Sequence, residues 1–136
     1  MDAIDFVSSK DIEIRGISLF RSYSGTKTFT GLIQLKEESS KAVIASQMFD
    51  FTTNDAQTYF DQLFNTPGNI RAGVKYTITL AYNGPRTRIW YGTNGQTSPS
   101  TTCGGDSVAF QFSASAETNN GNNVSRGQIP RVLISC

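Results

Sequence analysis

The chain has 136 residues and a mass of 14.8 kDa, which is enough for one domain with its own hydrophobic core. Its 12 lysine and arginine residues nearly balance 11 aspartate and glutamate residues, so there is no basic surplus that would bind nucleic acid or a charged membrane. The sequence contains no histidine, which excludes histidine acid–base catalysis and histidine-activated nucleophiles. We therefore predict a domain that is not an enzyme and has no cofactor or metal site.

The two cysteines, Cys103 and Cys136, form neither a C-x-x-C pair nor a zinc-binding set. Two thiols in a chain of this length are no disulfide framework, so we expect both to be reduced, as in a cytoplasmic protein. The first residues lack the pattern of a signal peptide, and no apolar run is long enough to cross a membrane. Because apolar residues reach both ends without a polar tail, we interpret residues 1–136 as a single domain excised from a larger protein.

Alternation of apolar and polar residues, the mark of a half-buried strand, recurs along the chain. It predicts strands at 3–7, 12–19, 29–35, 41–46, 74–82, 87–91, 108–112 and 128–135. The phase of the alternation changes at Gly16, which predicts a β-bulge. Turn-forming residues, such as those at 67–69 and 119–123, separate the segments. About ten short strands predict an antiparallel β-sandwich or barrel, with Tyr76 and Phe110 in its core.

One segment fits a helix as well as a strand. Ala56, Tyr59, Phe60, Leu63 and Phe64 follow helical spacing, and Pro67 would end the helix. Periodicity over so few residues does not distinguish the two structures.

A loop rich in asparagine is the first candidate binding site. Asn119, Asn120, Gly121, Asn122 and Asn123 place four side-chain amides, each with donors and an acceptor, on one loop that could hold a partner's polar groups. Asparagine and glycine also favour turns, so ordinary turn chemistry explains the same residues. Asn123 begins an N-glycosylation triplet that matters only in a secreted protein.

A second candidate is Trp90 with its neighbours Arg86 and Arg88. Alternation places these three side chains on one face of a predicted strand, and tryptophan with arginine is a common composition of interface hot spots. A single tryptophan in a sandwich also commonly fills the core. Two arginines are unsuited to a core, which favours exposure of this face.

The residues after Trp90 predict a tight hairpin that presents the same site. Tyr91, Gly92, Thr93, Asn94 and Gly95 include an Asn-Gly dipeptide suited to such a turn. No lysine follows as in a phosphate-binding loop, so the alternatives are a partner-binding turn and a purely structural one. The acidic residues, including Glu37, Glu38, Asp50 and Asp61, show no catalytic or metal-ligand spacing and are interpreted as solvated surface.

The order of several motifs resembles the PHR domain, a module of the Pam/Highwire family of giant intracellular ubiquitin ligases and of adaptors that combine BTB and BACK domains. The motifs are Asp5-Phe6, Ile14 to Phe20, Val74 to Thr77, Asn83-Gly84-Pro85, Tyr91 to Gly95, Asn119-Asn120-Gly121 and Gly127 to Ile134. The resemblance spans nearly the whole chain. It implies an antiparallel β-sandwich and a strand, not a helix, around Tyr59 to Phe64.

The resemblance also implies a function. The domain would be an intracellular protein-interaction module that selects partners or substrates for a large RING E3 ubiquitin ligase in axon and synapse development. We expect the isolated domain to be a monomer. Arg131 and the long segment 86–90 depart from the adaptor pattern and favour a giant ligase as the parent. The alternative from another class is a secreted or cell-surface carbohydrate-binding sandwich, in which Trp90 or Tyr91 stacks on a sugar.

Overall fold

The structure is a computed structural model, and it describes residues 2–20, 27–53, 59–83, 92–93, 100–103, 105–115, 126–127 and 131–135. These residues form strands joined by turns. The strands are β1 (Asp2–Ser8), β2 (Ile12–Phe20), β3 (Lys27–Glu37), β4 (Val43–Thr53), β5 (Tyr59–Ile70), β6 (Lys75–Asn83), β7 (Gly92–Thr93), β8 (Ser100–Cys103), β9 (Asp106–Ala114), β10 (Arg126–Gly127) and β11 (Arg131–Ser135).

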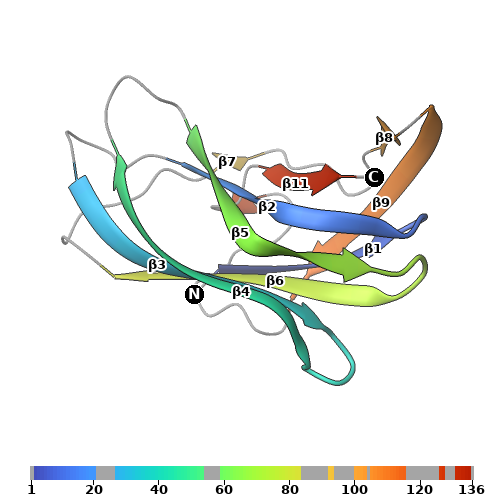
Figure 1. Cartoon of the computed structure of the whole chain (residues 1–136), viewed down its shortest axis with the longest axis horizontal. Helices are drawn as coiled ribbons and strands as arrows, with labels where there is room; N and C mark the ends of the chain where they lie inside the picture. The colour runs from blue at the N-terminus through green and yellow to red at the C-terminus, as the bar shows by residue number, and fades with distance from the viewer. Residues whose placement is uncertain are drawn as a thin grey trace.

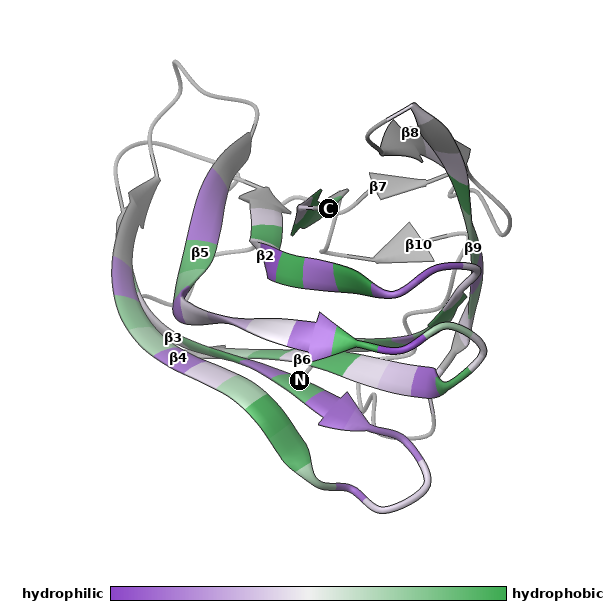
Figure 2. Cartoon of the chain, turned by 45° about the vertical axis from the view of Figure 1, so that its right-hand side comes forward, coloured by the Kyte–Doolittle hydropathy of each residue, from purple (hydrophilic) through white to green (hydrophobic). Residues whose placement is uncertain are grey.

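Two antiparallel sheets face each other across a hydrophobic core (Figure 1). The larger sheet has the strand order β4-β3-β6-β1-β9-β8, and the smaller sheet, β11-β2-β5, lies over part of it (Figure 2). The short strands β7 and β10 pair with each other outside both sheets. The predicted antiparallel β-sandwich is confirmed. The described residues contain eight strands of five or more residues, fewer than the predicted total of about ten.

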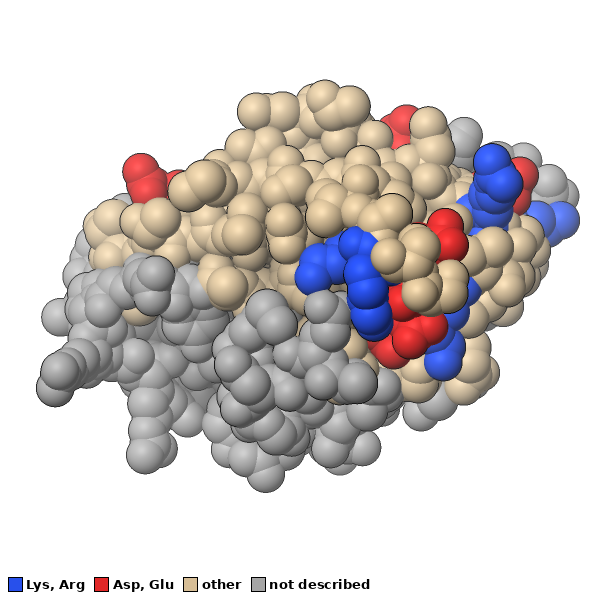
Figure 3. Space-filling model, turned by 90° about the horizontal axis from the view of Figure 1, so that it is seen from below, with Lys and Arg blue, Asp and Glu red and all other residues tan. Residues whose placement is uncertain are grey.

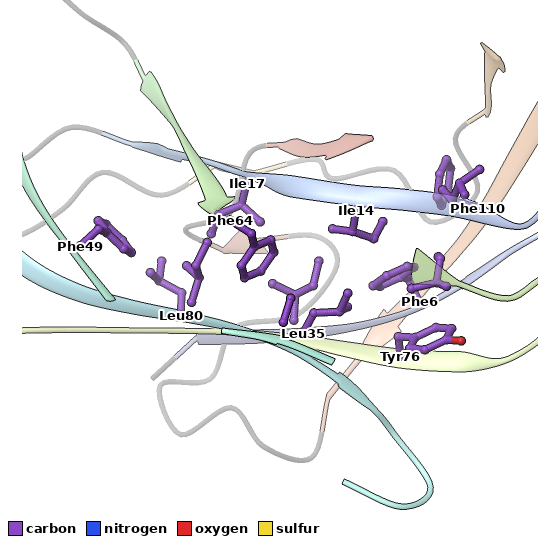
Figure 4. Packing of buried hydrophobic residues seen from close by; sticks show 14 of the residues in the cluster. Phe6, Ile14, Ile17, Leu35, Phe49, Phe64, Tyr76, Leu80 and Phe110 are labelled. Carbon is purple, nitrogen blue, oxygen red and sulfur yellow. The ribbon is translucent and has the colours of Figure 1, made fainter. Parts of the chain in front are cut away.

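The core forms where alternate residues of each strand point between the sheets. On β6, Tyr76, Ile78 and Leu80 are buried, as the alternation predicts. Phe6 is fully buried at the centre of an aromatic group, with its ring centroid 6.0 Å from that of Tyr76 and 6.4 Å from that of Phe110 (Figure 4). The predicted core positions Tyr76 and Phe110 are confirmed, with exposed fractions of 3% and 9%.

The segment with two possible structures is strand β5, as the family resemblance implies. It pairs with β2 from Tyr59 opposite Phe20 to Ile70 opposite Ile12. Gln62 is half-buried, and its side-chain amide donates a hydrogen bond to the Leu63 carbonyl oxygen at 3.0 Å. Local hydrogen bonding therefore accommodates this polar side chain within the strand.

The predicted turn at 67–69 is wrong, because these residues belong to β5. The pairing with β2 is interrupted between Leu63 and Gly68, and the strand bends there. The bend buries Phe64 in the core and brings Gly68 against the larger sheet. A Cβ atom on Gly68 would lie 2.7 Å from Leu35 Cδ2, so the glycine serves close packing of the two sheets.

The predicted bulge at Gly16 is confirmed. Leu133 of β11 pairs with Gly16 and the next residue, Ile134, pairs with Ile14, so Arg15 is the extra residue on β2. A bulge reverses the side-chain alternation of the strand. Ile14 and Ile17, three positions apart, are consequently both buried in the core.

Other strand boundaries differ from those predicted. The strand expected at 41–46 is β4, which begins at Val43 and continues to Thr53, because its pairing with β3 extends to Thr53 opposite Lys27. The strand expected at 87–91 lies outside the described residues. Of the strand expected at 128–135, the structure describes β11 from Arg131 onwards.

Two buried polar residues lie side by side on the larger sheet. Asp5 of β1 pairs with Thr77 of β6, and their exposed fractions are 6% and 0%. The Thr77 hydroxyl donates a hydrogen bond of 2.6 Å to Asp5 Oδ1. Because a buried carboxylate without donors is costly, this bond stabilises the pairing of β1 with β6.

Substitution Thr77→Val should lower the free energy of unfolding by about 2 kcal/mol, since it removes a buried donor to a carboxylate with little change of shape. Thr79→Val is a matched control, because Thr79 is also buried on β6 and its hydroxyl has no hydrogen-bond partner among the described residues. Urea unfolding followed by tryptophan fluorescence measures both. Equal effects of the two substitutions would show that the Asp5–Thr77 bond adds nothing to stability.

Candidate functional site

The predicted partner-binding residues fall mostly outside the described part of the chain. Gly92 and Thr93 are described, and they form β7. The others lie outside the described residues: Arg86, Arg88, Trp90, Tyr91, Asn94, Gly95, Asn119, Asn120, Gly121, Asn122 and Asn123. Their role in binding stays a prediction.

Strand β7 pairs with a segment far away in the sequence. Gly92 lies opposite Gly127 and Thr93 lies opposite Arg126, both on the antiparallel strand β10. The hairpin predicted around Asn94 and Gly95 stays a prediction, because both residues lie outside the described residues and a strand can pair along both of its edges. The pairing of β7 with β10 is a contact that no local pattern identifies.

The β7–β10 pair joins the two candidate loops at their bases. The chain runs from Thr93 into Asn94, and it reaches Arg126 from the asparagine-rich segment 119–123. Since Thr93 and Arg126 are directly opposed in an antiparallel pair, Asn94 and the asparagine-rich segment attach at the same end of this short ladder. Trp90 and Tyr91 precede Gly92 in the sequence and therefore join the ladder from its other end. Figure 1 draws β7 near β11, and Figure 2 draws β7 and β10 side by side.

Acidic side chains in the described residues make local contacts. A Glu38 carboxylate oxygen lies 3.9 Å from Lys41 Nζ in the β3–β4 turn, and Asp50 Oδ1 accepts a 3.1 Å hydrogen bond from Thr30. The Ser18 hydroxyl donates to Asp61 Oδ1 at 2.5 Å. Within the described ranges, no three acidic or cysteine side chains gather as metal ligands. In the described part of the face that Figure 3 shows, most side chains are uncharged, and both signs of charge are mixed at one end.

A surface hollow of about 520 Å³ lies where β2 begins and where β5 and β11 end. Its polar lining includes Asp11, Glu13, Asn69 and Arg71. Asp11 Oδ1 accepts a 2.7 Å hydrogen bond from the Ala72 N–H, so that carboxylate fixes the β5–β6 turn. Sequence reasoning missed this group because strand pairing alone brings its members together.

One of the two cysteines lies within the described residues. Cys103 ends strand β8, and Cys136 lies outside the described residues. Their reduced state remains a prediction, to be checked by mass spectrometry of the native chain without reductant. A native loss of two hydrogens would contradict it and would argue against a reducing compartment.

The fold defines an all-β domain, a two-sheet antiparallel sandwich with paired loop bases at one side. The sequence matches the family model of the PHR domain over residues 1–135. The chain belongs to the PHR domain family. No described segment is a helix long and apolar enough to cross a membrane.

Similar proteins include BTB/POZ domain-containing protein 6 of Xenopus tropicalis, 30% identical over 132 residues, which are 97% of this chain and 24% of that protein. The human protein of the same name is also 30% identical, over 97% of this chain and 23% of its own length. BTB/POZ domain-containing protein 3 of Mus musculus is 27% identical, over 97% of this chain and 24% of its own length. The chain thus spans about a quarter of the length of the curated relatives it matches.

Proposed function

We propose that this PHR domain is a non-enzymatic, intracellular module that binds another protein through the two loops joined at β7 and β10. The observation that carries the proposal is the pairing of Thr93 with Arg126, which attaches both candidate loops to one short ladder. Loops held on a rigid sandwich are the usual location of binding residues, because the sheet faces are occupied by packing.

Membership of the PHR domain family supports the wider role that we propose. The module selects partners or substrates for ubiquitin transfer by a large RING E3 ligase, in pathways of axon and synapse development, and the ligase chemistry resides in another region of the assembly. The names of the relatives support a parent that carries a BTB/POZ domain. The departures at Arg131 and 86–90 support a giant ligase instead, and the flanking sequence of the parent distinguishes the two.

Substitutions Trp90→Ala and Asn120→Ala test the loops directly. Each should weaken partner capture in cell extracts by about tenfold or more, since an interface anchor contributes about 2 kcal/mol or more. Both variants should melt at the temperature of the parent chain. Ser40→Ala is the control, because Ser40 is exposed in the β3–β4 turn, which is part of neither loop.

Pull-down with quantitative mass spectrometry measures capture, and calorimetry measures melting. Folded loop variants that retain every partner at the level of Ser40→Ala would refute the loop site. Loss of binding together with a lower melting temperature would assign these residues to folding, which also contradicts the proposal.

A further inference from the structure

Strand β4 is an edge of the larger sheet, and its outward side chains are exposed. Among the described residues β4 is paired with β3 on one side only. Ser46, Met48 and Asp50 are exposed, and Met48 has an exposed fraction of 70%. Met48 lies opposite Leu32 of β3, and Leu32 in turn lies opposite Ala81 of β6. Leu32 and Ala81 are half-buried, and they extend the apolar row that begins at Met48.

The backbone hydrogen bonds show which residues of β4 face the open edge. The Glu37 N–H donates to the Ala42 carbonyl beside β4, whereas the Glu38 N–H donates to the Lys75 carbonyl beside β6, both at 3.0 Å. Residues of β3 alternate between its two neighbours, so odd-numbered ones bond to β4.

The same alternation carries over to β4 through the pairing register. Ile33 pairs with Gln47 and Gly31 pairs with Phe49, so these two β4 residues bond to β3. Ser46, Met48 and Asp50 therefore direct their N–H and carbonyl groups to the open edge. The Met48 carbonyl oxygen already accepts a hydrogen bond of 2.8 Å from the Gln47 side-chain amide. A carbonyl oxygen has two lone pairs, so it can accept a second hydrogen bond from a partner strand. The N–H groups of these three residues have no partner among the described residues.

The edge lacks most of the features that normally prevent pairing with another strand, although the Gln47 side chain links it to β5, where Gln47 Oε1 accepts a 3.0 Å hydrogen bond from the Asn65 N–H. From Ser46 to Thr53 it contains no proline, glycine or lysine, and the β3–β4 irregularity lies earlier, beside Lys36. The only charged residue of β4 is Asp50. Polar cross-strand pairs, Gln34 with Ser46 and Thr30 with Asp50, flank the Met48 row on both sides. An apolar centre with a polar rim is the usual anatomy of an interface.

We propose that the open edge of β4 binds an extended segment of a partner protein by strand addition. The segment pairs antiparallel, as every strand pair in the described residues does. An apolar residue of the segment lies beside Met48, and a lysine or arginine two positions earlier lies beside Asp50. This surface belongs to β4, which pairs with neither β7 nor β10 among the described residues, so it goes beyond the function proposed above.

A blocked synthetic peptide, Thr-Lys-Thr-Val-Thr-Ser, is the probe. Titrated into the ¹⁵N-labelled chain, it should shift the amide signals of Ser46, Met48 and Asp50 and slow their hydrogen exchange. N-methylation of its valine removes the N–H that bonds to Met48 and should weaken binding about tenfold. N-methylation of the threonine before the valine is the matched control, because that N–H points away from β4, and it should leave binding nearly unchanged.

Charge reversal tests the pairing register without altering the backbone. Asp50→Lys should weaken binding of the lysine peptide by about threefold, and it should strengthen binding of the analogue that has glutamate in place of lysine. The N-methylated peptides need no change in the protein, so their result stands even if this variant folds poorly.

Three results would overturn the proposal. One is the absence of signal shifts at Ser46, Met48 and Asp50 with about 1 mM peptide, the limit of weak binding. Another is equal weakening by the two N-methylated peptides. The third is a dimer in sedimentation velocity that Met48→Lys dissociates, since the edge would then bind a second copy of this chain.

Discussion

Substitution Phe6→Ala should lower the free energy of unfolding by about 3 to 5 kcal/mol, a large part of the total stability of a domain this size. Phe6 is fully buried, and its ring contacts Tyr76, Phe110 and Phe112 at centroid distances of 6.0, 6.4 and 6.0 Å. It lies between β6 and β9 in the larger sheet, so its loss leaves a cavity that neighbouring backbone cannot fill.

Chemical unfolding monitored by circular dichroism gives the difference. Met48→Ala is the control, because the Met48 side chain is 70% exposed on β4, and its effect should stay within about 0.5 kcal/mol. A Phe6→Ala variant as stable as Met48→Ala would mean that the β6-β1-β9 register or the inward direction of Phe6 is wrong.

Substitution Gly16→Ala should destabilise the chain by about 3 kcal/mol, near the upper end for an overpacked site. A Cβ atom at Gly16 would clash with the Gln62 carbonyl oxygen and lie 2.7 Å from Leu63 Cα. Both are backbone atoms of the neighbouring strand β5, so no side-chain rotation relieves the clash. The whole β2–β5 pairing would have to move apart.

Thermal melting compares Gly16→Ala with Arg15→Ala, a change at the adjacent, exposed residue of the same bulge. Arg15→Ala should leave the melting temperature nearly unchanged. If both variants have the same melting temperature as the parent chain, the close approach of β5 to Gly16 is incorrect.

The sequence predicts those parts of the fold that depend on local alternation. Tyr76, Ile78 and Leu80 alternate with short polar residues, and they form the inner face of β6 as expected. The phase change at Gly16 predicts its bulge for the same reason, because one extra residue moves the following side chains to the opposite face.

Features that depend on distant contacts could not be read in this way. Gly68 follows a proline and resembles a turn residue, yet it lies in β5. A glycine is needed there because Leu35 of the other sheet leaves no room for a side chain. The Asp5–Thr77 hydrogen bond joins residues that are 72 positions apart in the sequence, and only the register of β1 against β6 places them opposite each other. Alternation of apolar and polar residues identifies a strand, but it does not identify the strands that pair with it.

The candidate site shows the same division. Its residue types, asparagine, glycine, tryptophan and arginine, are visible in the sequence as loop and interface residues. The pairing of Thr93 with Arg126 is not, because two-residue strands carry no periodic pattern. The open edge of β4 likewise depends on the strand order, which local alternation does not determine.

Site-specific photo-crosslinking in cells tests the loop site most directly. A photoreactive phenylalanine analogue is placed at Asn94, at Asn120 and, as a control, at Ser40 of the β3–β4 turn. Because both loops attach at the Thr93–Arg126 pair, positions 94 and 120 should crosslink to the same partner protein, and Ser40 should give only background. Crosslinks from the two loops that do not exceed those from Ser40, or that reach unrelated proteins, would contradict a shared protein-binding site at this end of the sandwich.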